Sequence, residues 1–281
     1  MTFVNKYKIL TEIQSSVNSK IYIAENNSKT NINHETVVIK SFSKLEKELF
    51  ILDKSFPFPI PKEMYFIRLI DDENLCPKIL DFFYNDAEFS IVMENLSGDW
   101  MELYGFLNIK YLSEKVVSKI VKNIITVLEK LISKGVYHLD IKLENIMLNQ
   151  ETHKIKFIDF ESSLYDRKNK NPKNNQFVGS VGYSSYEAVK ELTYDVKKNM
   201  VFEIGCIIYS CIECKLLFTT INDYEKIKTI SYHKCSQEVR TLIEKCLAYK
   251  PEDRIKLNKI LNHSWFHKQS FKRRFFNFNF N

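Results

Sequence analysis

Glycine and proline are scarce in this chain, with six of each among 281 residues, and no glycine precedes Gly98. The sequence also has no internal repeat and no long low-complexity stretch. These absences exclude a repetitive or linker-like chain. The hydrophobic content of 44% is ample for a buried core, so we expect a globular protein of one large or two moderate domains.

Long apolar runs are absent as well. No segment approaches the ~20 apolar residues that a helix needs to cross a bilayer, and the N-terminal stretch Met1–Lys6 lacks the apolar core of a signal peptide. We therefore expect an intracellular protein, cytoplasmic or nuclear, with no transmembrane segment. The abundance of Lys, Asn and Ile suggests an AT-rich genome, such as that of a virus or a reduced parasite, and a viral protein would act in the host cell.

Neither disulfide pairing nor strong charge is indicated. The six cysteines could form three disulfides, but four lie in apolar segments typical of helices, so buried free thiols are the better interpretation. The net charge of +6 is mild, and the lysines are spread along the chain. This charge favours acidic partners only weakly and does not predict nucleic-acid binding. We expect a monomer.

The periodicity of the apolar residues changes near residue 100. Up to about residue 95 short β-rich runs dominate, such as Tyr7–Ile13 and Val37–Lys40, with one helix expected over Pro61–Ile70. From about residue 100 helical patterns dominate. An apolar stripe follows the expected N-cap Ser113, and Asn199–Cys214 is apolar nearly all round. The pattern predicts an α+β fold, in which a small β-rich lobe is joined to a larger helical lobe.

The segment His138–Asn145 and the later Asp159 carry the strongest chemical signal. Asp140 is followed by Lys142 and then by Asn145, and Asp159 comes fourteen residues after that Asn. In phosphoryl transfer such a set supplies an Asp for the substrate hydroxyl, a Lys for the transferring group, and Asn and Asp ligands for magnesium. Apolar runs flank the polar residues, which favours a loop between buried strands over solvated surface charges.

With these motifs the chain resembles eukaryotic protein kinases over residues 7–267, and its spacing is most similar to the Pim type of the calcium/calmodulin-kinase group. The resemblance implies a bilobal protein-kinase-like fold, with an N-lobe over about 7–95, a hinge over about 94–98 and a C-lobe over about 99–267. It also implies a serine/threonine protein kinase that uses ATP with Mg²⁺ or Mn²⁺ to phosphorylate protein substrates, since Lys142 favours Ser or Thr as the acceptor. Residues 268–281 form a basic and aromatic tail, which either packs on the large lobe or contacts a membrane surface or nucleic acid.

The same resemblance assigns a nucleotide site. Lys40 matches the lysine that grips the α- and β-phosphates. Its acidic partner could be Glu46, Glu48 or Glu63, and Glu63 is favoured because the other two lie too near for a loop and a helix to intervene. The other candidates are the phosphate-loop positions Gln14, Ser16 and Ser19, the apolar residues Ile13, Ile21, Val38 and Met147 around the base, Met93 as gatekeeper, and the backbone near Glu94 and Leu96.

Structural and substrate-binding residues follow from the resemblance too. Glu187 ends the expected activation segment and would pair with Arg254 across the large lobe, and these two features argue against a small-molecule phosphotransferase. Glu102 and Glu144 match acidic positions that meet Arg in basic substrates, although solvated charges are the alternative. Ser180 is a further candidate for substrate recognition.

Three departures from the kinase pattern bear on activity. The phosphate loop has no glycine, so we expect a stiffer loop and weaker nucleotide binding. Leu139 replaces the Arg that receives an activation-loop phosphate, and Met200 stands near the place of the Asp that ties down the catalytic loop. Glu161 replaces the Gly after Asp159-Phe160, either as an extra metal ligand or, as we favour, as a solvent-facing charge. None of these changes removes a group that performs the transfer. Because of them, however, the alternative is a pseudokinase, which regulates a partner without turnover.

Overall fold

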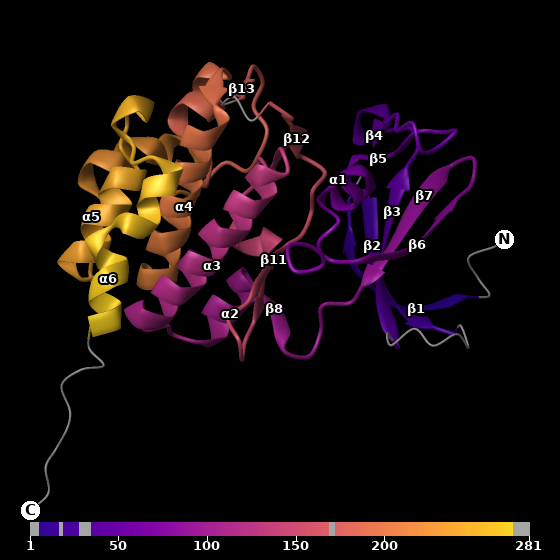
Figure 1. Cartoon of the computed structure of the whole chain (residues 1–281), viewed down its shortest axis with the longest axis horizontal. Helices are drawn as coiled ribbons and strands as arrows, with labels where there is room; N and C mark the ends of the chain where they lie inside the picture. Colours follow the sequence, from indigo (N-terminus) through magenta and orange to yellow (C-terminus); the bar gives the residue numbers. More distant parts are fainter. Residues whose placement is uncertain (1–5, 17–18, 28–34, 169–171, 272–281) are drawn as a thin grey trace, which may run out of the picture. The chain divides into compact units, whose positions relative to one another are not determined.

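The computed structural model describes residues 6–16, 19–27, 35–168 and 172–271 (Figure 1). The chain separates into two compact units, Met1–Met101 with Lys156–Ser163, and Glu102–Ile155 with Leu164–Asn281. The first unit holds the main sheet and the second holds most of the helices, which confirms the expected α+β class. Most of the expected basic and aromatic tail, residues 272–281, lies outside the described residues.

The first unit is built on an antiparallel sheet with the strand order β1-β2-β3-β7-β6 (Figure 1). Its strands are β1 (Tyr7–Ser15), β2 (Ser19–Asn26), β3 (Thr36–Ser43), β6 (Ile79–Tyr84) and β7 (Glu88–Glu94). Small, β-branched and aromatic side chains form a buried cluster on it, namely Tyr7, Ala24, Val37, Ile39 and Val92. The register places Ile21 opposite Lys40, and Val38 opposite Met93, so the strands align four of the candidate nucleotide-site residues.

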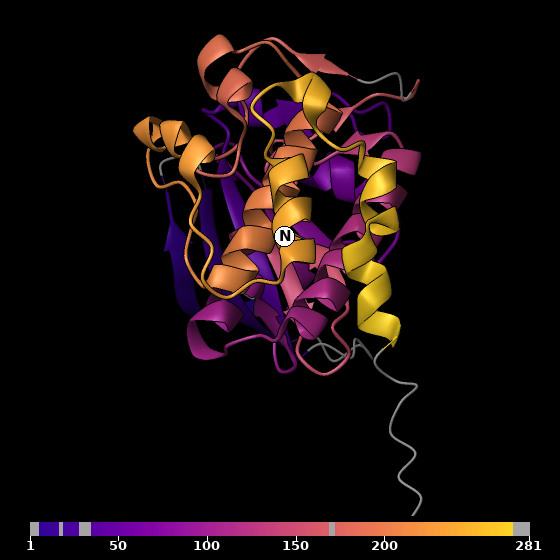
Figure 2. The same ribbon diagram turned by 90° about the vertical axis from the view of Figure 1, so that its left-hand side faces the viewer.

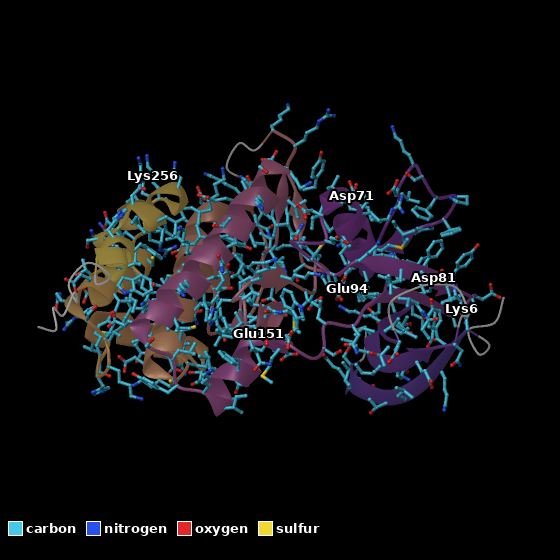
Figure 3. All side chains as sticks on the ribbon, turned by 60° about the horizontal axis from the view of Figure 1, so that its bottom comes forward. Lys6, Asp71, Asp81, Glu94, Glu151 and Lys256 are labelled. Atoms are coloured by element: carbon cyan, nitrogen blue, oxygen red, sulfur yellow. The ribbon has the colours of Figure 1, made fainter. Side chains whose placement is uncertain are left out.

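The two edges of this sheet are linked by side chains. Lys6, just before β1, forms an ion pair with Asp81 on β6 (Figure 3). The Tyr7 hydroxyl donates a hydrogen bond to the same carboxylate at 3.4 Å, and the Tyr7 ring meets Phe83 edge to face at a centroid distance of 5.6 Å. Since β1 and β6 are the outer strands of the sheet, these contacts require the sheet to be strongly curved.

Helix α1 (Lys62–Ile70) follows the paired short strands β4 (Phe50–Ile51) and β5 (Ile60–Pro61). Pro61 occupies the N-cap position, where its fixed φ favours the start of a helix, and α1 begins just after this proline, as expected. The buried face of α1 contains Met64, Phe66 and Ile70, and it also includes Glu63 in the first turn. An acidic side chain is therefore held on the buried side of the helix.

The second unit consists mainly of helices, and Figure 2 shows the later ones, from α4 onward, in orange and yellow. They are α2 (Leu103–Ile109), α3 (Glu114–Ser133), α4 (Val196–Glu213), α5 (Gln237–Cys246) and α6 (Ser264–Phe271), with shorter turns at Leu143–Asn145, Ile221–Thr229, Pro251–Asp253 and Leu257–Asn262. Helix α4 is buried nearly all round, as expected for a central helix. It begins earlier than expected because the Asp195 side chain caps it, accepting a hydrogen bond from the Lys198 N–H at 3.0 Å.

One half-buried acid joins three helices of this unit. The Glu114 carboxylate, at the start of α3, accepts hydrogen bonds from the hydroxyl of Ser236 at 2.8 Å and from the indole N–H of Trp265 at 3.1 Å. Ser236 is the N-cap of α5, and Trp265 lies on α6 and is almost fully buried. A single carboxylate therefore fixes the ends of α3, α5 and α6 together.

Glu187 and Arg254 form a two-pronged ion pair inside the second unit. The guanidinium nitrogens of Arg254 lie 2.5 and 2.9 Å from the two carboxylate oxygens of Glu187, and its Nε donates to the Ala248 carbonyl at 2.9 Å. Arg254 also stacks over the Phe202 ring at 5.0 Å. The pair joins the π-helical segment Glu187–Glu191 to Arg254, the residue that directly follows the turn Pro251–Asp253.

Short strands complete the chain. They are β8 (Trp100–Glu102), β9 (Val136–Tyr137), β10 (Ile146–Asn149), β11 (Ile155–Phe157), β12 (Leu164–Tyr165), β13 (Lys173–Asn174) and β14 (Tyr194–Asp195). All six cysteines are free, and four of them are buried, whereas Cys214 is exposed. Of the helices that the structure describes, none is both long and apolar enough to span a membrane.

Candidate active site

Asp140 lies in the second unit, on the loop between β9 and β10, and its side chain is held by three groups. Its Oδ1 accepts a hydrogen bond from the Ser180 hydroxyl at 2.8 Å. Its Oδ2 lies 2.7 Å from the Lys142 Nζ and accepts a hydrogen bond from the Asn145 amide at 3.0 Å. Asn145 also donates to the Asp140 carbonyl at 3.0 Å, so one amide fixes both the backbone and the side chain of Asp140.

Lys142 and Ser180 also contact each other. The Lys142 ammonium donates to the Ser180 Oγ at 2.9 Å, so an acid, an ammonium and a hydroxyl form a closed triangle. This geometry shows that Asp140 can accept a hydrogen bond from an alcohol while a cation stands beside the same alcohol oxygen. Such an arrangement suits removal of a hydroxyl proton with simultaneous neutralisation of negative charge.

The backbone around Asp140 is tightly packed. Leu139, the residue before it, has a left-handed φ of 63°, which is strained for a branched side chain. Gly179 has a φ of 121°, and a Cβ at this position would lie 2.8 Å from the Leu139 carbonyl oxygen and 2.9 Å from the Ser184 hydroxyl. Only glycine therefore allows the segment that carries Ser180 to approach the catalytic loop this closely.

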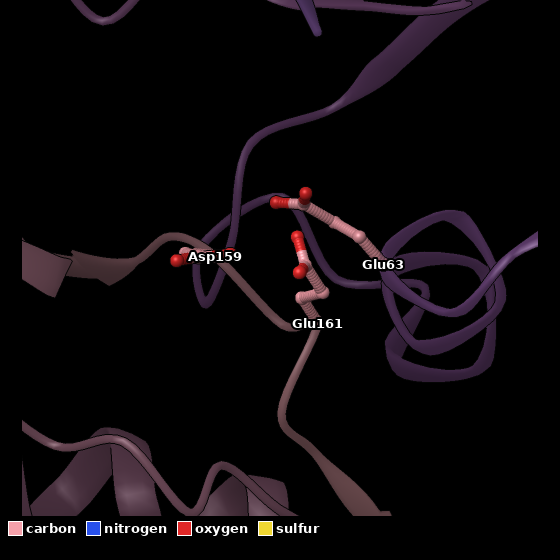
Figure 4. A group of neighbouring side chains, drawn as sticks. All are labelled: Glu63, Asp159 and Glu161. Carbon is pink, nitrogen blue, oxygen red and sulfur yellow. The ribbon is translucent and has the colours of Figure 1, made fainter. Parts of the chain in front are cut away.

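The first unit contains a second polar cluster, centred on Lys40. The segment Lys156–Ser163 belongs to this unit, and the Phe157 N–H donates to the Leu75 carbonyl at 2.9 Å. The Lys40 Nζ lies 2.7 Å from Glu63 Oε2, 2.9 Å from Asp159 Oδ1 and 3.3 Å from Glu161 Oε2. Figure 4 shows the three carboxylates converging from α1 and from the segment after β11.

The charges in this cluster depend on one another. Burial disfavours the charged form of Lys40, but the carboxylates of Glu63, Asp159 and Glu161 outweigh this and raise the pKa of Lys40 above its usual value. Burial raises the pKa of Glu63, and the neighbouring acids raise it further, while Lys40 opposes the increase. One buried ammonium thus compensates three acids, and the cluster carries excess negative charge when all three are ionised.

Glu161 was expected to be a solvent-facing charge, and this expectation is wrong. Its side chain is 24% exposed and its carboxylate is turned toward Lys40. The oxygens of Glu63, Asp159 and Glu161 lie within 4.8 Å of one another, a spacing that carboxylate ligands of a metal ion also show. The Lys40 ammonium already lies within 3.3 Å of all three, so it supplies the positive charge for this group.

A family model described as a protein kinase domain matches residues 7–266. The chain belongs to the protein kinase family. It is 29% identical to the serine/threonine-protein kinase pim-2 of Danio rerio over 194 residues, which cover 69% of this chain and 62% of that protein. It is 26% identical to CBL-interacting protein kinase 2 of Oryza sativa subsp. japonica over 273 residues, which cover 94% of this chain and 59% of that protein.

A third relative is the PAS domain-containing serine/threonine-protein kinase of Mus musculus, which is 29% identical over 83% of this chain but only 17% of that protein. The chain thus spans about three fifths, or less, of the length of these curated relatives. The expected resemblance to serine/threonine kinases, with a Pim-type kinase among the relatives, is confirmed. A viral source has no support in these relatives, which come from animals and a plant.

The expected phosphate loop has serine at positions where the family pattern has glycine. The Ser16 hydroxyl donates to the Ser19 carbonyl at 3.0 Å and accepts from the Ser19 N–H at 3.0 Å, and the Ser16 N–H also donates to that carbonyl. Gln14 pairs with Ile21 across the hairpin. These hydrogen bonds therefore join Ser16 to Ser19, the described residues on either side of residues 17–18, which lie outside the described part of the chain.

The other nucleotide-site candidates are spread over both units. Met93 is buried on β7, Val38 and Ile21 are half-buried, and Ile13 is 56% exposed on β1. Leu96 follows β7 and is half-buried, whereas Met147 is buried on β10 of the second unit. Of the acids weighed as partners for Lys40, Glu46 and Glu48 lie at the turn Lys47–Leu49, and Glu63 is the one that contacts the lysine.

The two acids proposed for substrate recognition influence each other. Glu102 lies just before α2, and Glu144 lies in the turn Leu143–Asn145, both in the second unit. Partial burial raises the pKa of Glu102, and the charge of Glu144 raises it further. Burial also raises the pKa of the Tyr183 hydroxyl, with a smaller contribution from Glu144. Glu102 is exposed and Glu144 is half-buried, and the charge of Glu144 is close enough to act on Glu102.

Sequence reasoning missed two features of polar side chains in this chain. Glu94 was singled out for its backbone, but its carboxylate forms an ion pair with Lys156, which also lies over the Trp100 ring at 5.5 Å. Glu203 is buried on α4 and was not considered at all. An acid in the middle of a helix that is apolar nearly all round was the signal that could have identified it.

Proposed function

We propose that this chain is an active serine/threonine protein kinase that transfers the γ-phosphate of ATP to Ser or Thr hydroxyls of proteins. The observation that carries this proposal is the Asp140–Lys142–Ser180 triangle, in which a carboxylate accepts a hydrogen bond from an alcohol beside an ammonium. A regulator without turnover would not need this geometry. The names of the curated relatives also give that alternative no support.

In this proposal each polar group has one task. Asp140 orients the acceptor hydroxyl and takes its proton, and Lys142 neutralises charge on the group in transit. Lys40, held by Glu63, grips the nucleotide phosphates. Asn145 and Asp159 offer the amide and carboxylate oxygens that Mg²⁺ or Mn²⁺ prefers, and the ions, when bound, neutralise the phosphates.

Radiolabelled γ-phosphate transfer to a Ser-containing peptide tests the activity. We expect transfer by the unmodified chain with Mg²⁺ or Mn²⁺, and its loss in Asp140→Asn with ADP binding retained. Glu151→Gln, an exposed acid of the same unit, is the matched control and should keep full activity. Persistent transfer by Asp140→Asn would refute the catalytic role of Asp140, and the absence of transfer by the unmodified chain would refute the proposed function.

We also propose that the substrates carry Arg on the N-terminal side of the acceptor, where Glu102 and Glu144 would meet it. Support comes from their mutual electrostatic influence, because a guanidinium would relieve the repulsion between them. Neutralising both, in Glu102→Gln/Glu144→Gln, should raise the KM of an Arg-containing peptide about tenfold, as expected when a charge-assisted contact is lost. The KM of a peptide with Ala in place of Arg should not change, and an equal effect on both peptides would contradict the assignment. An intracellular location and a monomeric state stay predictions from the sequence.

A further inference from the structure

Helix α4 carries two fully buried polar side chains one turn apart, Asn199 and Glu203, each 1% exposed. The Asn199 amide donates a hydrogen bond to Glu203 Oε1 at 2.9 Å. The Asn199 Oδ1 accepts from the backbone N–H of Ser185 at 2.8 Å. The other carboxyl oxygen, Glu203 Oε2, has no hydrogen-bond partner among the described residues.

The Ser185 N–H that Asn199 holds is close in the chain to the groups that touch Asp140. The N–H groups of Tyr183 and Ser184 both donate to the Ser180 carbonyl, at 3.2 and 3.1 Å, so residues 180–184 form one tight turn. The first residue of this turn places its hydroxyl on Asp140. The residue after the turn is fixed to α4 through Asn199. A hydrogen-bonded path therefore leads from Glu203 to the alcohol beside the catalytic carboxylate.

The protonation state of Glu203 matters for this path. Burial raises the pKa of Glu203 well above its usual value, and the charge of Asp140 raises it further, while the hydrogen bond from Asn199 opposes the increase. Glu203 in turn raises the pKa values of Cys206 on the same helix, Tyr194 on β14 and Tyr224 in the turn Ile221–Thr229. None of these three groups is a cation, so burial favours the protonated carboxyl group.

We propose that Glu203 is a positioning residue for phosphoryl transfer: through Asn199 and Ser185 it fixes the Ser180 turn against Asp140. This role rests on the proposed kinase activity, but the fixing of the turn does not. Glu203 itself touches none of the reacting groups. Its function is to hold the amide of Asn199 in the one orientation that leaves the Asn199 oxygen free for the Ser185 N–H.

Two substitutions separate this role from simple packing. Glu203→Gln keeps the size and an acceptor oxygen, whereas Glu203→Met keeps the approximate volume but removes the acceptor. Ser210→Ala, which removes another buried and unpartnered polar atom of α4, is the control. We expect Glu203→Met to lower kcat about tenfold or more, as small displacements of catalytic groups do, with little change in the KM for ATP. Glu203→Gln and Ser210→Ala should stay close to the unmodified chain.

Amide hydrogen exchange of the segment 179–186 provides a readout that needs no activity. In Glu203→Met the amides of this segment should exchange faster, even if the melting temperature of the variant is unchanged or higher. In Glu203→Gln and Ser210→Ala these amides should stay as protected as in the unmodified chain. Unchanged exchange in Glu203→Met, or equal losses in Glu203→Gln and Glu203→Met, would overturn the positioning role. Absent phosphate transfer with the expected exchange pattern would refute only the proposed function.

Discussion

Glu161 lies 3.3 Å from the Lys40 ammonium, so the residue that follows Phe160 adds a third acid to the lysine expected to hold the nucleotide phosphates. Lys40 is already paired with Glu63 at 2.7 Å and with Asp159 at 2.9 Å. The third carboxylate makes the surroundings of Lys40 more negative, and ATP brings further negative charge to it. We therefore expect the charge of Glu161 to affect nucleotide binding more directly than the transfer step.

Removing the charge of Glu161 should tighten the binding of a metal-free nucleotide. Glu161→Gln keeps the size of the side chain but abolishes its repulsion of the phosphates. One unit charge about 4 Å away contributes about 1 kcal/mol in a water-like dielectric, so we expect ADP to bind about fivefold more tightly. Isothermal titration with ADP in EDTA measures this, with Glu151→Gln as the control. Weaker ADP binding by Glu161→Gln would show that the carboxylate supports the nucleotide site instead of opposing it.

Replacing Lys40 should destabilise the first unit in a pH-dependent way. Lys40→Met leaves three acids close together without a cation, which costs about 3 kcal/mol, as expected for a buried ion pair with one partner removed. Burial and the neighbouring acids raise the folded-state pKa of Glu63, and the loss of Lys40 removes the group that opposes this increase. The folded state then favours the protonated acid, so stability is retained at low pH and lost as the pH rises through the raised pKa.

The expected result is a larger loss of stability in Lys40→Met at pH 7 than at pH 5, measured by urea unfolding. The titration of Lys40 itself lies outside this window, because its pKa is raised above 10.5 and its contribution is lost only in more alkaline solution. Lys78→Met, which replaces an exposed lysine of the same unit, is the control and should be pH-independent over this range. An equal loss at both pH values would mean that the acids do not repel one another in the folded state.

The sequence was sufficient to predict contacts between residues that lie close together in the chain. Asp140, Lys142 and Asn145 lie within six positions, so one loop brings them together whatever surrounds it. The direction of the Glu161 side chain was not predictable in the same way. It is decided by Lys40, more than a hundred residues away, and therefore by packing within the first unit. The path through Glu203 was not predictable for the same reason, because it depends on a contact between Asn199 on α4 and Ser185 on a separate segment of the chain.

The ion pair between Glu187 and Arg254 should be essential for the stability of the second unit. The Arg254 guanidinium is fully buried, and its nitrogens lie 2.5 and 2.9 Å from the two Glu187 oxygens. Arg254→Met should lower the free energy of unfolding by about 3 to 5 kcal/mol, because it leaves a buried carboxylate unpaired. The double variant Glu187→Leu/Arg254→Met should lose less than the sum of the two single variants. Urea unfolding of all four proteins gives this coupling energy, and strictly additive losses would contradict a direct interaction.

Ser180 offers a last test, because it was expected to recognise the substrate and its hydroxyl donates a hydrogen bond to Asp140. Ser180→Ala removes the donor to Asp140 Oδ1 and the acceptor of Lys142, while Ser180→Thr keeps the hydroxyl. If the hydroxyl positions the catalytic pair, Ser180→Ala should lower kcat about tenfold and leave the KM of the peptide unchanged, as expected when an interaction acts mainly in the transition state. Ser180→Thr should retain most of the activity. A change confined to the KM of the peptide would instead favour substrate recognition, since the contact would then act in binding and not in the transfer step. The kinetic constants of these two variants therefore decide which of the two roles the hydroxyl has.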